Sequence, residues 1–209
     1  MTPIDHPPSN ARSRGTRAAL LDATRALLED EGSAALTMGA VAERAGVSRR
    51  AVYLHFASRE QLLLALFHHV GQIEDLAGSL RPVYDAPDAV SALDAWAAHL
   101  ATFHTRIAPV AGAIERARRS DADAATHWSL VMQDRYRVCN DLATRLDREH
   151  RLSPHWTVDT AADMLFALMS SGVLESLTID RGWSTEQFRD QLAVLLRSTF
   201  VRPEDSRAG

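Results

Sequence analysis

The sequence predicts an all-α protein, and three observations support this prediction. Apolar residues recur at steps of three and four along most of the 209 residues, which is the spacing of one face of an α-helix. No segment alternates apolar and polar residues as a half-buried strand would. Gly, Pro and helix-capping Ser or Thr residues fall between the periodic runs, where helices end and begin.

The positions of these runs predict about nine helices. Four precede a break near residues 81–88, which Pro82 and Pro87 mark. In chain order the predicted helices cover residues 16–31, 37–44, 48–55, 58–80, 90–107, 109–119, 128–146, 154–173 and 184–200. We expect a disordered arm over residues 1–11, one domain over 12–60 and a second over 61–209.

Composition excludes several classes of protein. All 23 basic residues are Arg, so no mechanism can depend on a lysine. Cys139 is the only cysteine, which excludes an intrachain disulfide and a cysteine-based zinc site. The sequence has neither an apolar leader nor a run of about 20 apolar residues. We therefore expect a cytoplasmic protein with no membrane partner, and no cofactor or metal.

The most informative segment is residues 37–63, TMGAVAERAGVSRRAVYLHFASREQLL. Two short helices are joined by Ala45-Gly46-Val47-Ser48, and Gly46 supplies the left-handed conformation of a tight turn. An apolar set closes the two helices on each other, and the second helix exposes Arg and Tyr side chains that can donate hydrogen bonds. This pattern is typical of a helix-turn-helix. A simple helical corner with a solvated arginine pair would carry the same local pattern.

The segment resembles the TetR (tetracycline-repressor-like) family of bacterial transcriptional regulators. The resemblance rests on Thr37-Met38, Val41-Ala42, residues 45–48, Val52-Tyr53-Leu54-His55-Phe56 and residues 58–63. Arg59 stands where the family usually has Lys. The rest of the chain resembles the family in helix order and length, and in the turn from Asp180 to Ser184.

The resemblance implies roles for individual side chains. Arg49 and Arg50 would face the major groove, where a guanidinium suits guanine O6 and N7. Thr37, Tyr53, His55 and Arg59 would contact phosphates, although capping or packing would explain Thr37 and Tyr53 equally well. The complete predicted DNA-binding set is Arg14, Arg17, Thr37, Met38, Ser48, Arg49, Arg50, Tyr53, His55 and Arg59.

The net charge of −4 argues weakly against DNA binding, but the charge is unevenly distributed. Residues 1–60 contain eight Arg and seven acidic residues, whereas the remaining 149 contain 15 Arg and 20 acidic residues. Residues 37–59 alone contain four Arg and one acidic residue. DNA binding needs a local positive face rather than a basic whole, so the objection does not hold.

The family's second half binds a small effector and forms a dimer. For a hydrophobic or aromatic effector the predicted contacts are Trp96, Leu100, Phe103, Ile107, Trp128, Met132, Tyr136, Phe166 and Met169. For the dimer interface they are Ala161, Leu165, Leu168, Gly172, Phe188, Leu192, Leu195 and Leu196. Residues at this helical spacing can equally well be ordinary core.

These observations favour a homodimeric repressor that a ligand releases from a near-palindromic DNA operator. The alternatives are a DNA-binding regulator without an effector, or one that acts as an activator. An enzyme is not expected, because no nucleophile with a partnering base, and no metal-ligand motif, is evident in the sequence.

Overall fold

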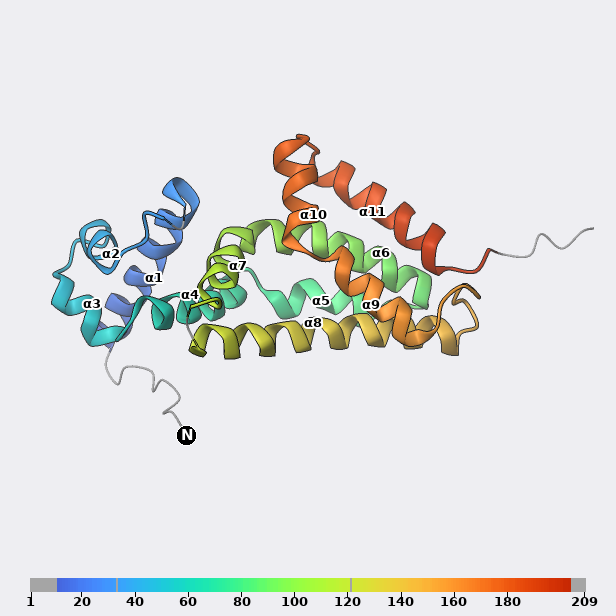
Figure 1. Cartoon of the computed structure of the whole chain (residues 1–209), viewed down its shortest axis with the longest axis horizontal. Coiled ribbons are helices and arrows are strands. Elements are labelled where there is room, and N and C mark those ends of the chain that lie inside the picture. The colour runs from blue at the N-terminus through green and yellow to red at the C-terminus, as the bar shows by residue number, and fades with distance from the viewer. Residues whose placement is uncertain (1–10, 33, 121, 204–209) are drawn as a thin grey trace, which may run out of the picture. The chain divides into compact units, whose positions relative to one another are not determined.

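The all-α prediction is confirmed. A computed structural model describes residues 11–32, 34–120 and 122–203, and this part contains α-helices, two π-helical stretches and no strand (Figure 1). The arm predicted over residues 1–11 lies, apart from Ala11, outside the described residues. The elements are α1 (Ala11–Glu31), α2 (Met38–Arg44), α3 (Arg49–His55), α4 (Arg59–Ile73), α5 (Leu76–Tyr84), α6 (Ala89–His99), η1 (Leu100–His104), α7 (Thr105–Ala117), α8 (Ala122–Arg148), α9 (Val158–Leu168), α10 (Ser171–Glu175), η2 (Ser176–Asp180) and α11 (Thr185–Phe200).

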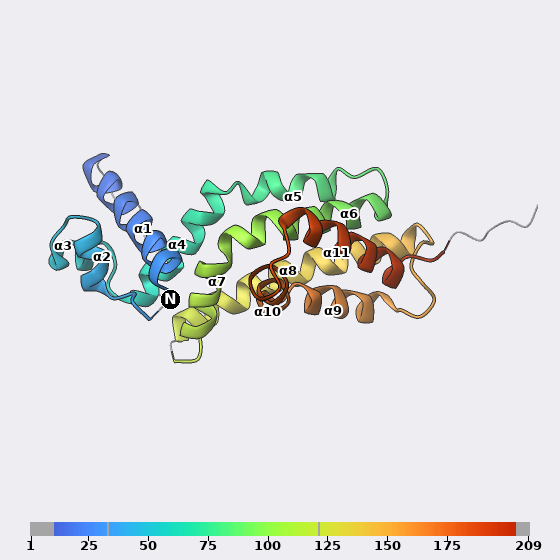
Figure 2. The ribbon, with the colours of Figure 1, turned by 90° about the horizontal axis from the view of Figure 1, so that it is seen from above.

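The chain divides into two compact units. The first comprises Met1–Ile73 and Pro109–Trp128, and the second comprises Glu74–Ala108 and Ser129–Gly209. In the second unit α6 packs against α5 and α11, and its core also takes side chains from α8 and α9 (Figure 2). The predicted domain limit after residue 60 falls within the first unit, so the limits proposed from sequence remain a prediction.

The helix predicted over residues 58–80 is interrupted at Asp75. This residue adopts a left-handed conformation, with φ of 50°, and its carboxylate accepts a hydrogen bond from the amide of Gly78 at 3.0 Å. The carboxylate therefore caps a new helix, α5, in place of continuing α4.

Two further helix ends differ from the prediction. Pro109 lies inside α7 instead of starting a helix, because burial of Ile107, Val110 and Ile114 holds the helix despite the backbone hydrogen bond that proline loses. The helix predicted over residues 154–173 begins at Val158, capped by Thr157, and ends at Leu168. Ser170 then caps α10.

No single helix among the described residues is long and apolar enough to cross a membrane. The pair Val158–Leu168 and Gly172–Asp180 passes the same criteria only when taken together, across a bend of 50°.

Candidate DNA-binding interface

The turn between α2 and α3 is closed by a specific pattern of backbone hydrogen bonds. Gly46 has φ of +66°, and its amide donates a hydrogen bond to the carbonyl of Glu43 at 3.1 Å. The amide of Val47 donates to the carbonyl of Ala42 at 2.9 Å. This is the Schellman arrangement, in which a residue with positive φ satisfies the last carbonyls of a helix. The turn that the sequence predicts at Gly46 is therefore present.

Side-chain caps set where the two helices begin. The hydroxyl of Thr37 accepts a hydrogen bond from the amide of Ala40 at 3.1 Å, and the hydroxyl of Ser48 accepts one from that of Ala51 at 3.2 Å. Both side chains are exposed. A capping hydroxyl keeps a lone pair for a further donor but does not itself read a base, so each cap acts first by positioning its helix.

A compact apolar core fixes α3 against the other helices of the first unit. Val41, Val52 and Phe56 are each at most 1% exposed. Met38, predicted to contact DNA, is only 7% exposed, so its side chain belongs to this core. Because the core occupies one side of α3, the other side is left free for a partner.

Arg49 and Tyr53 form a pair on the exposed side of α3. The guanidinium carbon of Arg49 lies 5.7 Å from the centroid of the Tyr53 ring, and its Nη2 lies 3.5 Å from the Tyr53 hydroxyl oxygen. Tyr53 is 45% exposed. The ring therefore holds the guanidinium against the helix and limits the directions in which Arg49 can point.

Arg50 and Leu54 form a second exposed pair, one helical turn apart. Arg50 is exposed, and Leu54, at 77%, is more exposed than the other large hydrophobic residues of the described chain. The sequence analysis did not select Leu54 as a site residue, because a leucine in an amphipathic helix is expected to be buried. His55 ends the helix and is half-buried, with its ring 6.3 Å from that of Phe56.

Two of the predicted arginines contact the protein itself. The guanidinium of Arg17 lies 5.0 Å from the centroid of the Phe56 ring, and Nε of Arg59 donates to the carbonyl of Leu36 at 3.0 Å. Arg59 thus ties the start of α4 to the chain ahead of α2. Arg14 is exposed on the first turns of α1.

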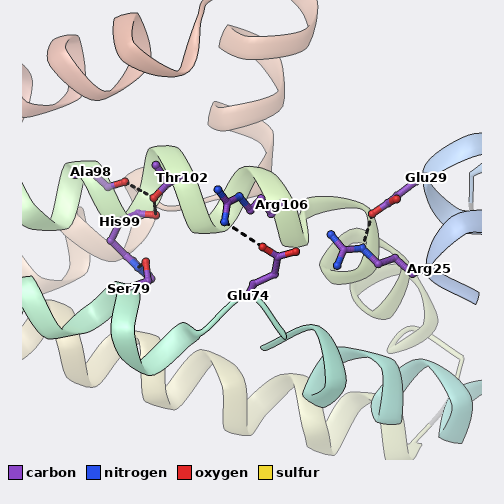
Figure 3. Close-up of polar contacts among 8 residues, drawn as sticks. All are labelled: Arg25, Glu29, Glu74, Ser79, Ala98, His99, Thr102 and Arg106. Atoms are coloured by element: carbon purple, nitrogen blue, oxygen red, sulfur yellow. Dashed lines mark hydrogen bonds and ion pairs between the residues drawn. The ribbon is translucent and has the colours of Figure 1, made fainter. Parts of the chain in front are cut away.

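Ion pairs decide which positive charges stay available. Arg25 pairs with Glu29 at 2.6 Å (Figure 3), and Arg44 pairs with Asp30 and, at 3.3 Å, with Glu31. In the part of the chain that the structure describes, Arg49 and Arg50 form no ion pair. The uncompensated charge of the helix-turn-helix is therefore concentrated on α3, as the uneven charge of the sequence predicts.

The predicted effector contacts fall into buried and accessible groups. Trp96, Leu100, Phe103, Ile107 and Met169 are at most 5% exposed. Trp128 and Met132 are partly buried, with the guanidinium of Arg118 5.7 Å from the Trp128 ring. Tyr136, 36% exposed, has its ring 5.9 Å from that of Phe166. All of these residues except Tyr136 are thus consistent with ordinary core as well as with the lining of an effector site.

Most of the predicted dimer contacts are buried in the chain's own core, and the dimer interface stays a prediction. Ala161, Leu165, Phe188, Leu192 and Leu196 are at most 5% exposed and belong to the core of the second unit. Leu168 is partly buried, whereas Gly172 and Leu195 are exposed. The exposed apolar side chains of α9 and α11 are instead Met164, Val194 and Leu195, at 41%, 51% and 45%.

A groove of about 500 Å³ between α5 and α8 was not predicted from the sequence. Val83, Tyr84 and Leu142 line it together with Arg145, Arg148 and Glu149. Val83 and Tyr84 lie in the break predicted near residues 81–88, whereas Leu142 and Arg145 lie in the helix predicted over residues 128–146. Spacing along the chain therefore gives no sign that they meet.

The geometry on α3 and its flanking helices is that of a helix-turn-helix. Residues 20–66 match the model of the bacterial regulatory proteins of the tetR family. The helix-turn-helix part of the chain is thus similar to the regulatory proteins of this family.

Two relatives show the same similarity in sequence. The chain is 40% identical over 79 residues to the HTH-type transcriptional regulator BetI of Rhizobium meliloti, and 44% identical over 69 residues to the HTH-type transcriptional repressor LfrR of Mycolicibacterium smegmatis. The matches cover 38% and 33% of this chain, and 34% and 35% of the relatives. The chain thus spans about a third of the length of the curated relatives it matches.

The fold extends the similarity over most of the chain. A transcriptional regulator from Saccharomonospora viridis, solved in complex with choline, superposes with a TM-score of 0.74. The match covers 90% of this chain and 98% of that one at 16% sequence identity. At this identity the comparison shows a shared fold and carries no information about the ligand of this chain.

Proposed function

We propose that this protein is a homodimeric repressor of transcription that a small molecule releases from a near-palindromic operator. The observation that carries the proposal is the pair of exposed arginines on α3, which form no ion pair among the described residues. Residues 12–60 would supply the DNA-binding surface, and residues 61–209 the effector site and the dimer contact. Such a protein would act in the cytoplasm, where bacterial DNA lies.

The DNA-binding step follows from the charge and shape of the helix-turn-helix. Arg49 and Arg50 stand on a helix whose opposite face is buried, so the helix can enter a major groove without unfolding. Thr37, Tyr53 and Arg59 would hold phosphates and set the depth of α3. Two copies related by a two-fold axis would read half-sites about 34–36 Å apart, one helical turn of DNA.

Release by an effector requires a ligand that binds the DNA-incompetent state more tightly than the competent one. The aromatic interior of the second unit supports an apolar or aromatic ligand. Leu66 and Val70, at most 1% exposed on α4, pack the helix that leads directly to α5 and the second unit. Replacing either by Ala should therefore alter the response to the effector.

The first experiment is a selection from a pool of random DNA duplexes, followed by fluorescence anisotropy on the selected sequence. We expect the wild-type chain to enrich a near-palindrome, and the Arg49→Ala, Arg50→Ala double variant to lose specific binding. A matched control replaces the exposed Arg181 and Arg202 of the second unit by Ala and should bind as the wild type does. If the double variant keeps its specific affinity, α3 is not the recognition helix.

The second experiment tests release. Choline and a library of aromatic amphiphiles are screened for thermal stabilisation of the chain, and those that stabilise it are added to the DNA complex. We expect at least one such compound to dissociate the complex. A compound that stabilises the chain and tightens DNA binding would instead indicate a co-repressor, and the absence of any effect across the library would contradict an effector of this class.

A further inference from the structure

The exposed surface of α3 has two edges of different chemistry. Arg49 and Tyr53 lie one turn apart on one edge, and Arg50 and Leu54 lie one turn apart on the other. Neighbouring positions on a helix are rotated by about 100°. When α3 lies in a groove, the two edges therefore point toward different parts of it.

The Arg49–Tyr53 edge suits the phosphate wall. Its guanidinium lies over the Tyr53 ring and within 3.5 Å of the phenolic oxygen. The edge therefore presents a guanidinium and a hydroxyl, both of which donate hydrogen bonds to phosphate oxygens.

The Arg50–Leu54 edge suits the floor of the groove. A leucine that is 77% exposed gains nothing from a phosphate, because it has no group that can pair with an anion. The major groove offers one apolar group on its floor, the C5-methyl of thymine. Arg50, one turn away, carries the guanidinium that pairs with guanine O6 and N7.

We propose that the Arg50–Leu54 edge of α3 faces the base pairs and that Leu54 determines specificity by packing on a thymine methyl group. The inference rests on the proposed DNA binding and deepens it. It assigns base reading to Arg50 and phosphate contact to Arg49, which the sequence alone left undivided.

The helix geometry sets the register of this contact. Residues four apart are separated by about 6 Å along a helix axis, and base pairs are stacked about 3.4 Å apart. The thymine read by Leu54 should therefore lie about two base pairs from the guanine read by Arg50, in each half-site.

The test uses the full chain and the duplex selected from the random pool. Each thymine of the half-site is replaced in turn by deoxyuridine, which lacks only the methyl group. We expect one position at which the replacement weakens wild-type binding about fourfold per half-site, the loss expected for one buried methyl group. The Leu54→Ala variant should bind the thymine and deoxyuridine duplexes equally.

A control variant removes a similar apolar surface elsewhere. Ile179→Ala replaces a residue that is 74% exposed in the second unit and should retain the wild-type difference between the two duplexes. Because Leu54 and Ile179 are both exposed, neither substitution should disturb the core, which circular dichroism can verify.

Two companion variants test the division between the edges. Arg50→Ala should lose the preference for guanine at one position, whereas Arg49→Ala should weaken binding to all duplexes evenly and reduce the salt dependence by about one ion. If the two variants exchange these effects, the assigned orientation of α3 is wrong.

The failures of the two proposals are distinguishable. A wild-type chain that selects a near-palindrome but tolerates deoxyuridine at every thymine would refute the role of Leu54 and leave the repressor proposal intact. A chain that selects no sequence would refute both. A Leu54→Ala variant with unchanged DNA binding but altered self-association would assign Leu54 to a protein contact and overturn the thymine contact.

Discussion

The hydroxyl oxygen of Ser79 lies 2.8 Å from Nδ1 of His99 and links α5 to α6 inside the second unit (Figure 3). The His99 ring is 3% exposed and stacks between Trp96 and Phe103, with centroids 5.1 and 5.2 Å away. Burial, and secondarily the charge of Arg135, lowers the pKa of His99 to about 4. The imidazole is therefore neutral at physiological pH.

The free energy of unfolding should fall as the pH drops from 6.5 toward 4. In this window His99 is protonated in the unfolded chain but neutral in the folded one, so acid favours the unfolded state. The full effect is on the order of 3 kcal/mol. His104, whose pKa burial also lowers and whose ring lies 5.5 Å from that of His99, adds in the same direction.

Denaturant unfolding across this pH range measures the effect. His99→Phe keeps a ring between Trp96 and Phe103 but cannot titrate, so its stability should depend less on pH than that of the wild type. His155→Phe makes the same substitution at an exposed histidine and serves as the control. Equal slopes for the wild type and His99→Phe would show that His99 titrates normally in the folded protein.

Cys139 should be unreactive in the folded protein. Its sulfur is buried, with Sγ 3.3 Å from Sδ of Met169, and burial raises the pKa of the thiol to about 12. Because the thiolate is the reactive species, a thiol reagent such as iodoacetamide should modify Cys139 only after denaturation. Mass spectrometry measures the modified fraction, and rapid labelling at pH 8 without denaturant would contradict this burial.

Two glycines should respond in opposite directions to the same substitution. Gly46 has φ of +66°, so Gly46→Ala strains the backbone and should cost about 1–2 kcal/mol, although no atom lies within 4 Å of the added Cβ. Gly71 lies inside α4 with equally open space around it. Gly71→Ala should stabilise the chain by about 0.5–1 kcal/mol, because alanine loses less conformational entropy in a helix.

Thermal unfolding of the two variants and the wild type checks this pair. Since neither added methyl group meets another atom, the difference between the variants isolates the backbone conformation. A Gly46→Ala protein as stable as the wild type would mean that the turn does not hold a left-handed residue at this position.

The helix-turn-helix could be predicted in detail because its determinants are local. Thr37, Gly46 and Ser48 act on amides and carbonyls within five residues of themselves. The helix break at Asp75 also has a local cause, but the sequence does not predict it. Asp75 caps α5 through Gly78, but an aspartate in an otherwise periodic run does not reveal that it will adopt a left-handed conformation.

The partners of an apolar stripe could not be predicted, because periodicity identifies an apolar face but not what covers it. Leu165 and Leu196 lie on the stripes from which a dimer contact is predicted, and within one chain they fill the core. The same limit applies to Arg59, whose bond to the Leu36 carbonyl joins positions 23 residues apart. Leu54 is apolar but lies outside the buried face of α3, and its exposure of 77% is evident only from the packed structure.

Self-association should depend on the exposed residues of α11 rather than on its buried stripe. Val194 and Leu195 are 51% and 45% exposed, so a partner subunit can reach them while Leu192 and Leu196 remain internal. If α11 lies in the dimer contact, Leu195→Glu places a charge in an apolar interface and should shift the dimer toward monomer. Leu130→Glu alters a residue of α8 that is 55% exposed and serves as the control.

Analytical ultracentrifugation of the three proteins measures the shift, and anisotropy on the selected duplex measures its consequence. A monomer occupies one half-site, so the Leu195→Glu variant should lose the affinity that comes from binding two half-sites at once, while its preference for each half-site persists. The fold of the variant should survive because the substituted side chain is not part of the core. A Leu195→Glu protein that remains dimeric, beside an unchanged control, would place the dimer contact on another face of the second unit.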